Sequence, residues 1–326
     1  MEAYLEIKNL KVSIDTIEGR NRVLDIDHFR LEKGESFGIV GESGSGKTIL
    51  AQSILRILPS PPAVIEGGEI LFQGEDLLKT KEKRMQRKIR GEKISMIFQD
   101  PMSSLNPVFR VGDQIRYVIK KHNKHLSRKE LDEAVLEKLR MVKLPDVENT
   151  QNKYPNELSG GQRQRVIIAI ALSCGAELLI ADEPTRNLDV TIQAGVLKLL
   201  FGLKKELGIT TLFIANNINL VFIVSNRVGV LYKGKIIELG PSQVIKNDPR
   251  HPYTFELLGR GQICEKERTL PSIEKDLKAL LESGNNLCPY INQCCFAEKE
   301  CFQRTPPAVE VEKGHWVSCF REISGR

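Results

Sequence analysis

The chain alternates short apolar runs with polar or glycine-rich turns and segments of helical periodicity. Residues 36–40 form one such run, and apolar residues at helical spacing follow over 48–58. The runs at 178–181 and 211–215 are apolar at successive positions, which is typical of strands buried on both faces of a parallel sheet. With a hairpin around Lys233-Gly234, the pattern predicts an α/β domain.

A highly charged segment of helical periodicity interrupts the α/β pattern. The sequence Ser-Arg-Lys-Glu from Ser127 is a capping box, in which side chains satisfy free N–H groups at a helix start. Leu131, Val135 and Leu139 then recur every four residues, which predicts an amphipathic helix. We therefore expect a helical subdomain over about residues 100–162.

Changes in composition divide the chain into two predicted domains. The first, residues 1–248, contains the α/β pattern, and a break near Asp248-Pro249 starts a C-terminal extension over residues 249–326. Hydrophobic residues make up 41% of the 326 residues, which is enough for a buried core. The net charge of +6 is small beside 28% charged residues, so we predict an ordinary solvated surface and no nucleic-acid partner.

No part of the sequence is apolar enough to predict a membrane span. The most apolar stretch, residues 212–224, is broken by Asn216, Asn217 and Asn219. The N-terminus has neither the basic start nor the apolar segment of a signal peptide, which predicts a cytosolic protein. Any membrane association would then be peripheral and made through partner subunits.

A phosphate-binding loop follows the first apolar run. Glycines in such a loop let backbone N–H groups surround phosphate oxygens at a helix start. We expect the lysine of this loop to hold the β- and γ-phosphates of ATP, and the threonine hydroxyl to ligate Mg²⁺, which neutralises charge as the γ-phosphoryl group leaves. The residues that match this Walker A pattern are Gly41, Glu42, Ser43, Gly44, Ser45, Gly46, Lys47 and Thr48.

Two carboxylates follow the apolar run at 178–181. Asp182 stands where a Walker B aspartate contacts the magnesium shell, and Glu183 follows it. We predict that Glu183 is the general base that orients and deprotonates the attacking water. Alone, an Asp-Glu pair at a strand end could be a helix N-cap, but the Walker A loop favours the catalytic interpretation.

A third motif makes the class of protein specific. Leu158 precedes a serine, two glycines and a glutamine that open a predicted helix and match the ABC signature: Ser159, Gly160, Gly161 and Gln162. Such a helix start presents N–H groups and a hydroxyl to an anion. With Gln99 in a Q-loop and Leu188-Asp189 at the end of a D-loop, the chain resembles the ABC ATPase family over roughly residues 1–240.

The resemblance implies a P-loop ABC-type nucleotide-binding domain, with a RecA-like core and a helical subdomain. It implies ATP sites at a head-to-tail dimer interface, where the Walker A loop of one subunit meets the signature of the other. Gln99 would sense Mg²⁺ and water and couple the site to membrane subunits. Asp189 would belong to the nucleotide-binding set.

Residues 99–107, 182–193 and the sequence His251-Pro252-Tyr253-Thr254 look like the D-type ATPases of oligopeptide, dipeptide and nickel importers. That resemblance implies a translocase on the cytoplasmic face of the cell membrane. Its partners would be a second ATPase subunit, two transmembrane permease subunits and an extracellular substrate-binding protein. The cargo, peptide or nickel, stays open because the binding protein and permeases select it.

Four cysteines of the extension form a candidate metal site. They are spaced C-x5-C-x6-C-x17-C, and clustered cysteines in a cytosolic chain favour a metal over disulfides. Four thiolates can hold either Zn²⁺ or an iron–sulfur cluster, and the spacing does not separate the two. The family resemblance favours a four-iron, four-sulfur cluster on Cys288, Cys294, Cys301 and Cys319.

A few positions depart from the family pattern. Asn216 replaces the switch histidine that normally contacts the γ-phosphate, and an amide cannot carry a proton's charge. We therefore hypothesise that the site on this chain's Walker A loop hydrolyses ATP slowly, while its signature completes a site in a non-identical partner. Arg186-Asn187 replaces small residues of the D-loop, and Ile14 stands where an adenine-stacking aromatic residue is expected.

Two other functions compete with that of a transport motor. A regulatory subunit that senses ATP but scarcely hydrolyses it would fit Asn216 and the cysteine-bearing extension, whereas Glu183 argues against complete inactivity. A soluble ABC ATPase acting on DNA or ribosomes usually carries tandem cassettes, a long coiled-coil insertion or a strongly basic stripe. The sequence has none of these features.

Overall fold

The computed structural model describes residues 3–100, 104–260 and 287–321, and their strands form two sheets. The strands are β1 (Leu5–Thr16), β2 (Gly19–Leu31), β3 (Ser36–Val40), β4 (Ala63–Phe72), β5 (Glu75–Asp76), β6 (Ile94–Ile97), β7 (Leu178–Asp182), β8 (Thr210–Ala215), β9 (Arg227–Tyr232), β10 (Lys235–Pro241), β11 (Val309–Glu312) and β12 (His315–Val317). The larger sheet has the order β11-β12-β10-β9-β3-β8-β7-β6, and the smaller has the order β2-β1-β4-β5.

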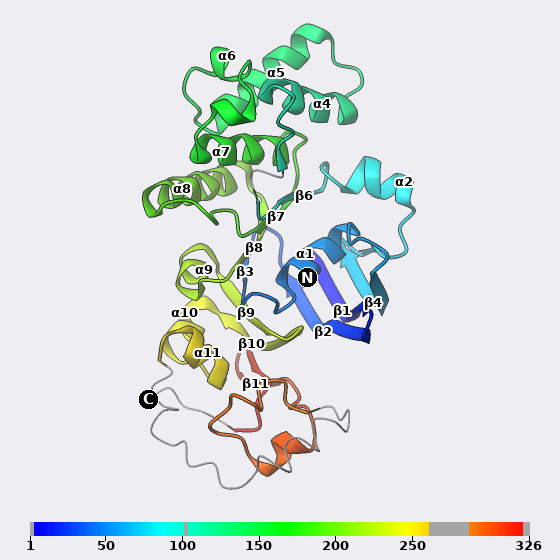
Figure 1. Ribbon diagram of the computed structural model, residues 1–326, viewed down its shortest axis with the longest axis vertical. Helices are drawn as coiled ribbons and strands as arrows, with labels where there is room; N and C mark the ends of the chain where they lie inside the picture. The colour runs from blue at the N-terminus through cyan, green and yellow to red at the C-terminus, as the bar shows by residue number, and fades with distance from the viewer. Residues whose placement is uncertain (1–2, 101–103, 261–286, 322–326) are drawn as a thin grey trace.

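Helices surround the larger sheet, and one group of them stands apart at the end of the molecule opposite the C-terminal extension (Figure 1). The helices are α1 (Lys47–Leu55), α2 (Glu82–Arg84), α4 (Val111–His122), α5 (Arg128–Met141), α6 (Val147–Thr150), α7 (Gly160–Ala171), α8 (Val190–Leu207), α9 (Ile218–Val224), α10 (Ser242–Asn247) and α11 (Pro252–Leu257), with short helical turns η1 (Met85–Ile89), η2 (Pro155–Glu157) and η4 (Lys299–Phe302). Across the described ranges, no helix combines the length and apolar character that crossing a membrane requires.

The centre of the larger sheet is parallel, as the uninterrupted apolar runs predicted. Strand β3 pairs in parallel with β8 and β9, while β7 pairs in parallel with β6 and β8. Every residue of β3 and β7 is buried. Parallel neighbours end at the same edge of a sheet, which is where open α/β sheets bind ligands. The residues that follow β3, β6, β7 and β8 are therefore brought to one edge.

Helices α4 to α6 lie within the predicted helical subdomain, and α7 begins at its predicted end and continues to Ala171. Helix α5 begins after Ser127, whose hydroxyl accepts the N–H of Glu130 at 3.4 Å while the Glu130 carboxylate accepts the N–H of Ser127 at 2.7 Å. Both bonds of the predicted capping box are present. Leu131, Val135 and Leu139 are buried in a core cluster shared with residues of α4 and α7, so the predicted apolar face of α5 is confirmed.

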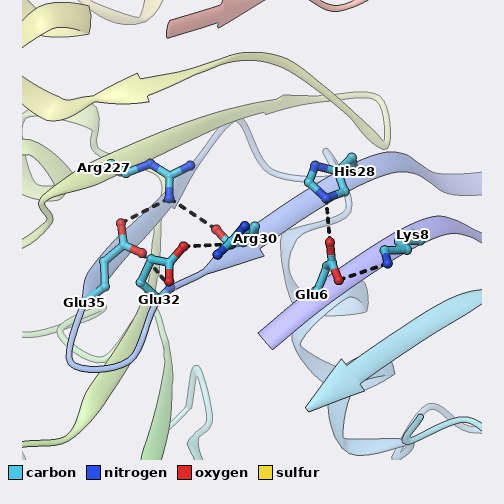
Figure 2. Close-up of polar contacts among 7 residues, drawn as sticks. All are labelled: Glu6, Lys8, His28, Arg30, Glu32, Glu35 and Arg227. Carbon is cyan, nitrogen blue, oxygen red and sulfur yellow. Dashed lines mark hydrogen bonds and ion pairs between the residues drawn. The ribbon is translucent and has the colours of Figure 1, made fainter. Parts of the chain in front are cut away.

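The smaller antiparallel sheet was not predicted from the sequence. It lies beside the larger sheet, and Arg227 of β9 connects the two (Figure 2). The guanidinium donates to the Arg30 carbonyl oxygen of β2 at 3.3 Å and forms an ion pair of 3.4 Å with Glu35. The same group lies 5.2 Å from the centre of the Phe37 ring in β3. This contact fixes the small sheet against the strand that leads into the Walker A loop.

The C-terminal extension continues the larger sheet. Strand β12 pairs with β10, placing Val317 opposite Glu238. The buried Glu238 carboxylate accepts the N–H groups of Arg250 at 2.8 Å and His251 at 3.0 Å, and it lies 2.8 Å from Nε2 of His315. One buried carboxylate thus binds both the start of α11 and the last strand, which holds the extension against the cassette.

Candidate nucleotide site

The Walker A loop joins β3 to α1, and its lysine is folded back onto the loop. Nζ of Lys47 donates to the carbonyl oxygens of Gly41 and Glu42, both at 2.7 Å. Burial lowers the pKa of Lys47, while the charges of Glu183 and Asp182 oppose that shift. The ammonium group is therefore held on the loop and feels the charges of two carboxylates, as expected for a Walker A lysine that binds phosphates.

Contacts from distant parts of the chain hold this loop in place, and sequence reasoning did not find them. The N–H of Gly234, in the β9–β10 turn, donates to the Ser45 carbonyl oxygen at 2.8 Å. The N–H of Glu42 donates to the phenol oxygen of Tyr253, in α11, at 2.9 Å. At Gly41, a Cβ atom would lie 2.1 Å from the Leu231 carbonyl oxygen, so a side chain cannot be accommodated there without a shift of the backbone.

A hydroxyl and a carboxylate meet beside the loop where Mg²⁺ is expected. The Thr48 hydroxyl donates to Oδ2 of Asp182 at 2.8 Å. Oδ1 of Asp182 is buried and has no hydrogen-bond partner, and burial raises the pKa of this carboxyl group. A buried unpaired carboxylate oxygen is costly unless a partner satisfies it. Hydroxyl and carboxylate oxygens are Mg²⁺ ligands, so these residues fit the ion.

Glu183 has an unusual backbone conformation and an unexpected partner. Its φ angle is +45°, and its N–H donates to the Ile214 carbonyl oxygen of β8 at 2.8 Å. The side chain is 12% exposed, and its Oε2 lies 3.3 Å from Nη1 of Arg186. Arg186 is one of the residues that depart from the family pattern, and in this structure it pairs with the predicted general base.

The predicted catalytic residues follow three neighbouring parallel strands. Gln99 comes two residues after β6, Glu183 directly after β7, and Asn216 directly after β8. Asn216 is exposed, and Gln99 is partly buried. The topology therefore brings these three side chains to the edge that carries the Walker A loop. Residues 101–103, which belong to the segment 99–107 that resembles the importer ATPases, lie outside the described residues.

The signature opens α7 as an anion-binding helix start would. Ser159 is the N-cap, and its hydroxyl accepts the N–H of Gln162 at 3.3 Å. The Gln162 side chain in turn accepts the N–H of Ser159 at 3.0 Å. The signature belongs to the helical group, whereas the Walker A loop lies between β3 and α1 (Figure 1).

The signature glycines pack against the start of α8. A Cβ on Gly161 would lie 2.7 Å from Cγ2 of Ile192, and one on Gly160 would lie 3.4 Å from Leu188. Asp189 caps α8 by accepting the N–H of Ile192 at 3.0 Å. In this structure Asp189 therefore orders the D-loop and the helix that supports the signature, and its predicted contact with nucleotide stays a prediction.

The cysteines of the extension gather at one place. Those predicted as ligands are free thiols that line the same small cavity: Cys288, Cys294, Cys301 and Cys319. Backbone N–H groups of Tyr290, Phe296 and Arg321 donate to sulfurs of this set. Burial raises the pKa of Cys294 to about 12 and that of Cys319 to about 11. Within the described ranges, however, no group of three or more His, Cys, Asp or Glu residues is placed to hold a metal ion.

The parallel sheet, the phosphate loop and the paired carboxylates define a P-loop nucleotide-hydrolysing cassette. Solved structures agree with this class. The ATP-binding cassette MJ0796, in a dimeric post-hydrolysis state bound to ADP and Pi, superposes with a TM-score of 0.65 at 26% identity, covering 73% of this chain and 98% of that one.

Sequence comparisons then give the family. The model described as "ABC transporter" matches residues 24–186, and that described as "Oligopeptide/dipeptide transporter, C-terminal region" matches residues 237–301. The oligopeptide transport ATP-binding protein OppD of Bacillus subtilis is 42% identical, covering 97% of this chain and 88% of that protein. The dipeptide transport ATP-binding protein DppD of the same organism is 45% identical, covering 98% and 95%. The chain therefore belongs to the ABC transporter family as an ATP-binding subunit, and its activity is ATP hydrolysis.

Proposed function

We propose that this chain is the ATPase subunit of a peptide importer, attached to the cytoplasmic face of the membrane through two permease subunits. The cargo is inferred from relatives that are named for oligopeptide and dipeptide transport. The observation that carries the proposal is the convergence of Lys47, Thr48, Asp182 and Glu183 at one sheet edge. An extracellular binding protein delivers the peptide, and nickel is the alternative cargo.

Each catalytic residue has a distinct part in the proposed reaction. Lys47 binds the β- and γ-phosphates, and the backbone N–H groups of residues 43–48 surround them. Thr48 and Asp182 hold Mg²⁺, which when bound neutralises charge on the phosphates. Glu183 accepts a proton from the attacking water, and Gln99 orients that water. In a transporter whose partner ATPase site has been inactivated, Glu183→Gln is expected to reduce the remaining turnover by at least about 100-fold while ATP still binds. Unchanged turnover in that transporter would remove Glu183 from this part.

The cassette is proposed to work as half of an unlike pair. Its signature at Ser159 completes a site built on the Walker A loop of a second, non-identical ATPase subunit. Its own site is slow because the exposed amide of Asn216 stands where a switch histidine is expected, and because Arg186 engages Glu183. Asn216→His is expected to raise ATP turnover of the assembled transporter, with Asn219→His as the matched surface control. No increase would contradict a slow site caused by Asn216.

We also propose that the extension, residues 249–326, holds a four-iron, four-sulfur cluster. The support is the donor set, since four free thiols line one cavity and accept backbone N–H groups. The same four thiolates could hold a single Zn²⁺, which is the alternative occupant. Burial favours the protonated thiol of Cys294, so this thiol must lose its proton when a cluster binds.

Metal analysis of the anaerobically purified full chain tests this site. We expect iron and acid-labile sulfide together with a visible absorption band. Cys301→Ser is expected to lose all three, and Cys174→Ser, which lies in the cassette, is expected to keep them. Zinc in place of iron would support the alternative ion, and the absence of both metals would exclude a metal site.

A further inference from the structure

A buried tyrosine of the C-terminal extension contacts the phosphate-binding loop directly. Tyr253 is fully buried, and its phenol oxygen accepts the N–H of Glu42 at 2.9 Å across 211 positions of sequence. Burial raises the pKa of this phenol, so it stays protonated. None of the roles assigned so far to the Walker A loop or to the extension accounts for this contact.

The contact acts on the peptide group that also binds the Walker A lysine. The Gly41 carbonyl oxygen, which belongs to the same peptide group as the Glu42 N–H, accepts from Nζ of Lys47 at 2.7 Å, while that N–H is held by Tyr253. Because one peptide group carries both bonds, a shift of Tyr253 moves an anchor of the lysine. The N–H of Glu42 is bonded to the phenol of Tyr253 and is not free to bind phosphate. The bond therefore fixes the start of the loop.

Tyr253 also lies next to the four-cysteine cavity. Its N–H donates to Nδ1 of His251 at 3.1 Å, and its ring centre lies 5.6 Å from that of Tyr290. His251 and Tyr290 both line the cavity together with the cysteines. Tyr290 is two positions after Cys288, and its N–H donates to that sulfur. A chain of packed side chains therefore leads from the thiols to the nucleotide loop.

We propose that Tyr253 is a positioning residue for the Walker A loop, and that it makes nucleotide affinity depend on the packing of the four-cysteine cavity. The inference rests on the proposed role of Lys47 in binding ATP. It extends that role by giving the extension a direct influence on the cassette. A contiguous contact path is not in itself coupling, so the test must measure coupling between the two ends.

The first experiment compares two tyrosines of the same aromatic cluster in the full chain. Tyr253→Phe removes only the hydroxyl that accepts from Glu42. Tyr232→Phe removes a hydroxyl whose hydrogen bond is to Gln293, at 3.1 Å. We expect Tyr253→Phe to raise the Kd of ATP about fivefold, the factor for one hydrogen bond, and Tyr232→Phe to leave it unchanged.

Thermal unfolding of both variants without nucleotide is the control for general destabilisation. Because the two variants lose similar buried hydroxyls, a loss of ATP affinity confined to Tyr253→Phe reflects positioning of the loop. Lys47→Ala provides a separate test of the proposed function. If Lys47→Ala retains full ATP affinity, the assigned site is wrong. If Lys47→Ala loses affinity but Tyr253→Phe binds ATP like the wild type, positioning by Tyr253 is wrong.

The second experiment is a double-mutant cycle between the cavity and the tyrosine. Cys288→Ser is expected to raise the Kd of ATP by about twofold or more in the wild-type background and to have no further effect when Tyr253 is phenylalanine. An equal increase in both backgrounds, or no increase in the wild type, would refute the dependence on the cavity through Tyr253.

Discussion

Replacing Arg186 by threonine should accelerate ATP hydrolysis at the site on this chain. In the structure one guanidinium nitrogen of Arg186 lies 3.3 Å from Oε2 of Glu183, the predicted general base. While this ion pair persists, that oxygen is held by a cation and must be released before it can accept a proton from water. Arg186 thus competes with the attacking water for the carboxylate.

The exposure of the pair sets the size of the effect. The Arg186 side chain is 44% exposed and that of Glu183 is 12% exposed, so solvent screens the attraction. Pairs of this kind contribute about 0.2–1 kcal/mol. If breaking the pair costs that free energy before reaction, Arg186→Thr raises kcat by up to about fivefold. The ATP KM should change little, because the Lys47 and Thr48 contacts are untouched.

The assay is ATP turnover at saturating nucleotide by the assembled transporter with its partner ATPase site inactivated, measured with Arg186→Lys as the control that keeps a positive charge. The increase should disappear in a Glu183→Gln background, since the effect acts through that carboxylate. A decrease in kcat for Arg186→Thr would refute the reasoning. It would mean that Arg186 stabilises charge on the transferring phosphoryl group and so assists the reaction.

Two further predictions concern buried titratable groups. Asp182→Asn removes a buried carboxylate whose pKa is raised by burial. The free energy of unfolding without nucleotide should therefore rise by on the order of 1 kcal/mol, while Mg²⁺-dependent ATP binding is lost. A fall in stability in urea titrations would contradict this prediction. Burial lowers the pKa of His251 to about 3, so the unfolded chain binds a proton that the folded chain does not as pH falls below about 6.5. Stability should therefore decrease with falling pH by up to about 1.4 kcal/mol per unit, and His251→Asn, which can cap α11 in the same way, should flatten this dependence; equal slopes for the two proteins would contradict the prediction.

Local patterns explain which parts of the fold were predictable. The runs that became β3, β7 and β8 are apolar at most successive positions because both faces of a parallel sheet are covered, and neighbouring residues alone reveal this pattern. The capping box at Ser127 is likewise local. The small antiparallel sheet was missed, although residues at alternate positions of β1, such as Leu5 and Ile7, are buried, which is the usual signal of a half-buried strand.

The motifs placed the nucleotide site, but not the contacts that support it. The Walker A and Walker B residues are brought together by strand order, which a parallel α/β pattern implies. The sequence gives no reason to expect the left-handed backbone at Glu183 or the ion pair of Glu183 with Arg186. The bond from Glu42 to Tyr253 joins residues that are 211 positions apart in the sequence. The sequence His251-Pro252-Tyr253-Thr254 indicated the family resemblance, but nothing in it predicted that Tyr253 contacts the Walker A loop.

The cysteine spacing predicted a cluster of thiols but not its occupant. The structure places the four thiols around one cavity, yet the described residues include no group placed for a single metal ion. Spacing records only the order of ligands along the chain, whereas the choice between zinc and an iron–sulfur cluster depends on how far apart the sulfurs are held.

The most direct test of the account is the ATPase activity of the reconstituted transporter with its binding protein. One sample has the binding protein loaded with oligopeptides, and the other has it loaded with nickel chelates. The account predicts that peptide stimulates hydrolysis and that Lys47→Ala in this subunit reduces the stimulated rate. Stimulation by nickel alone would contradict peptide import, and no stimulation by either cargo would contradict the role of a transport motor.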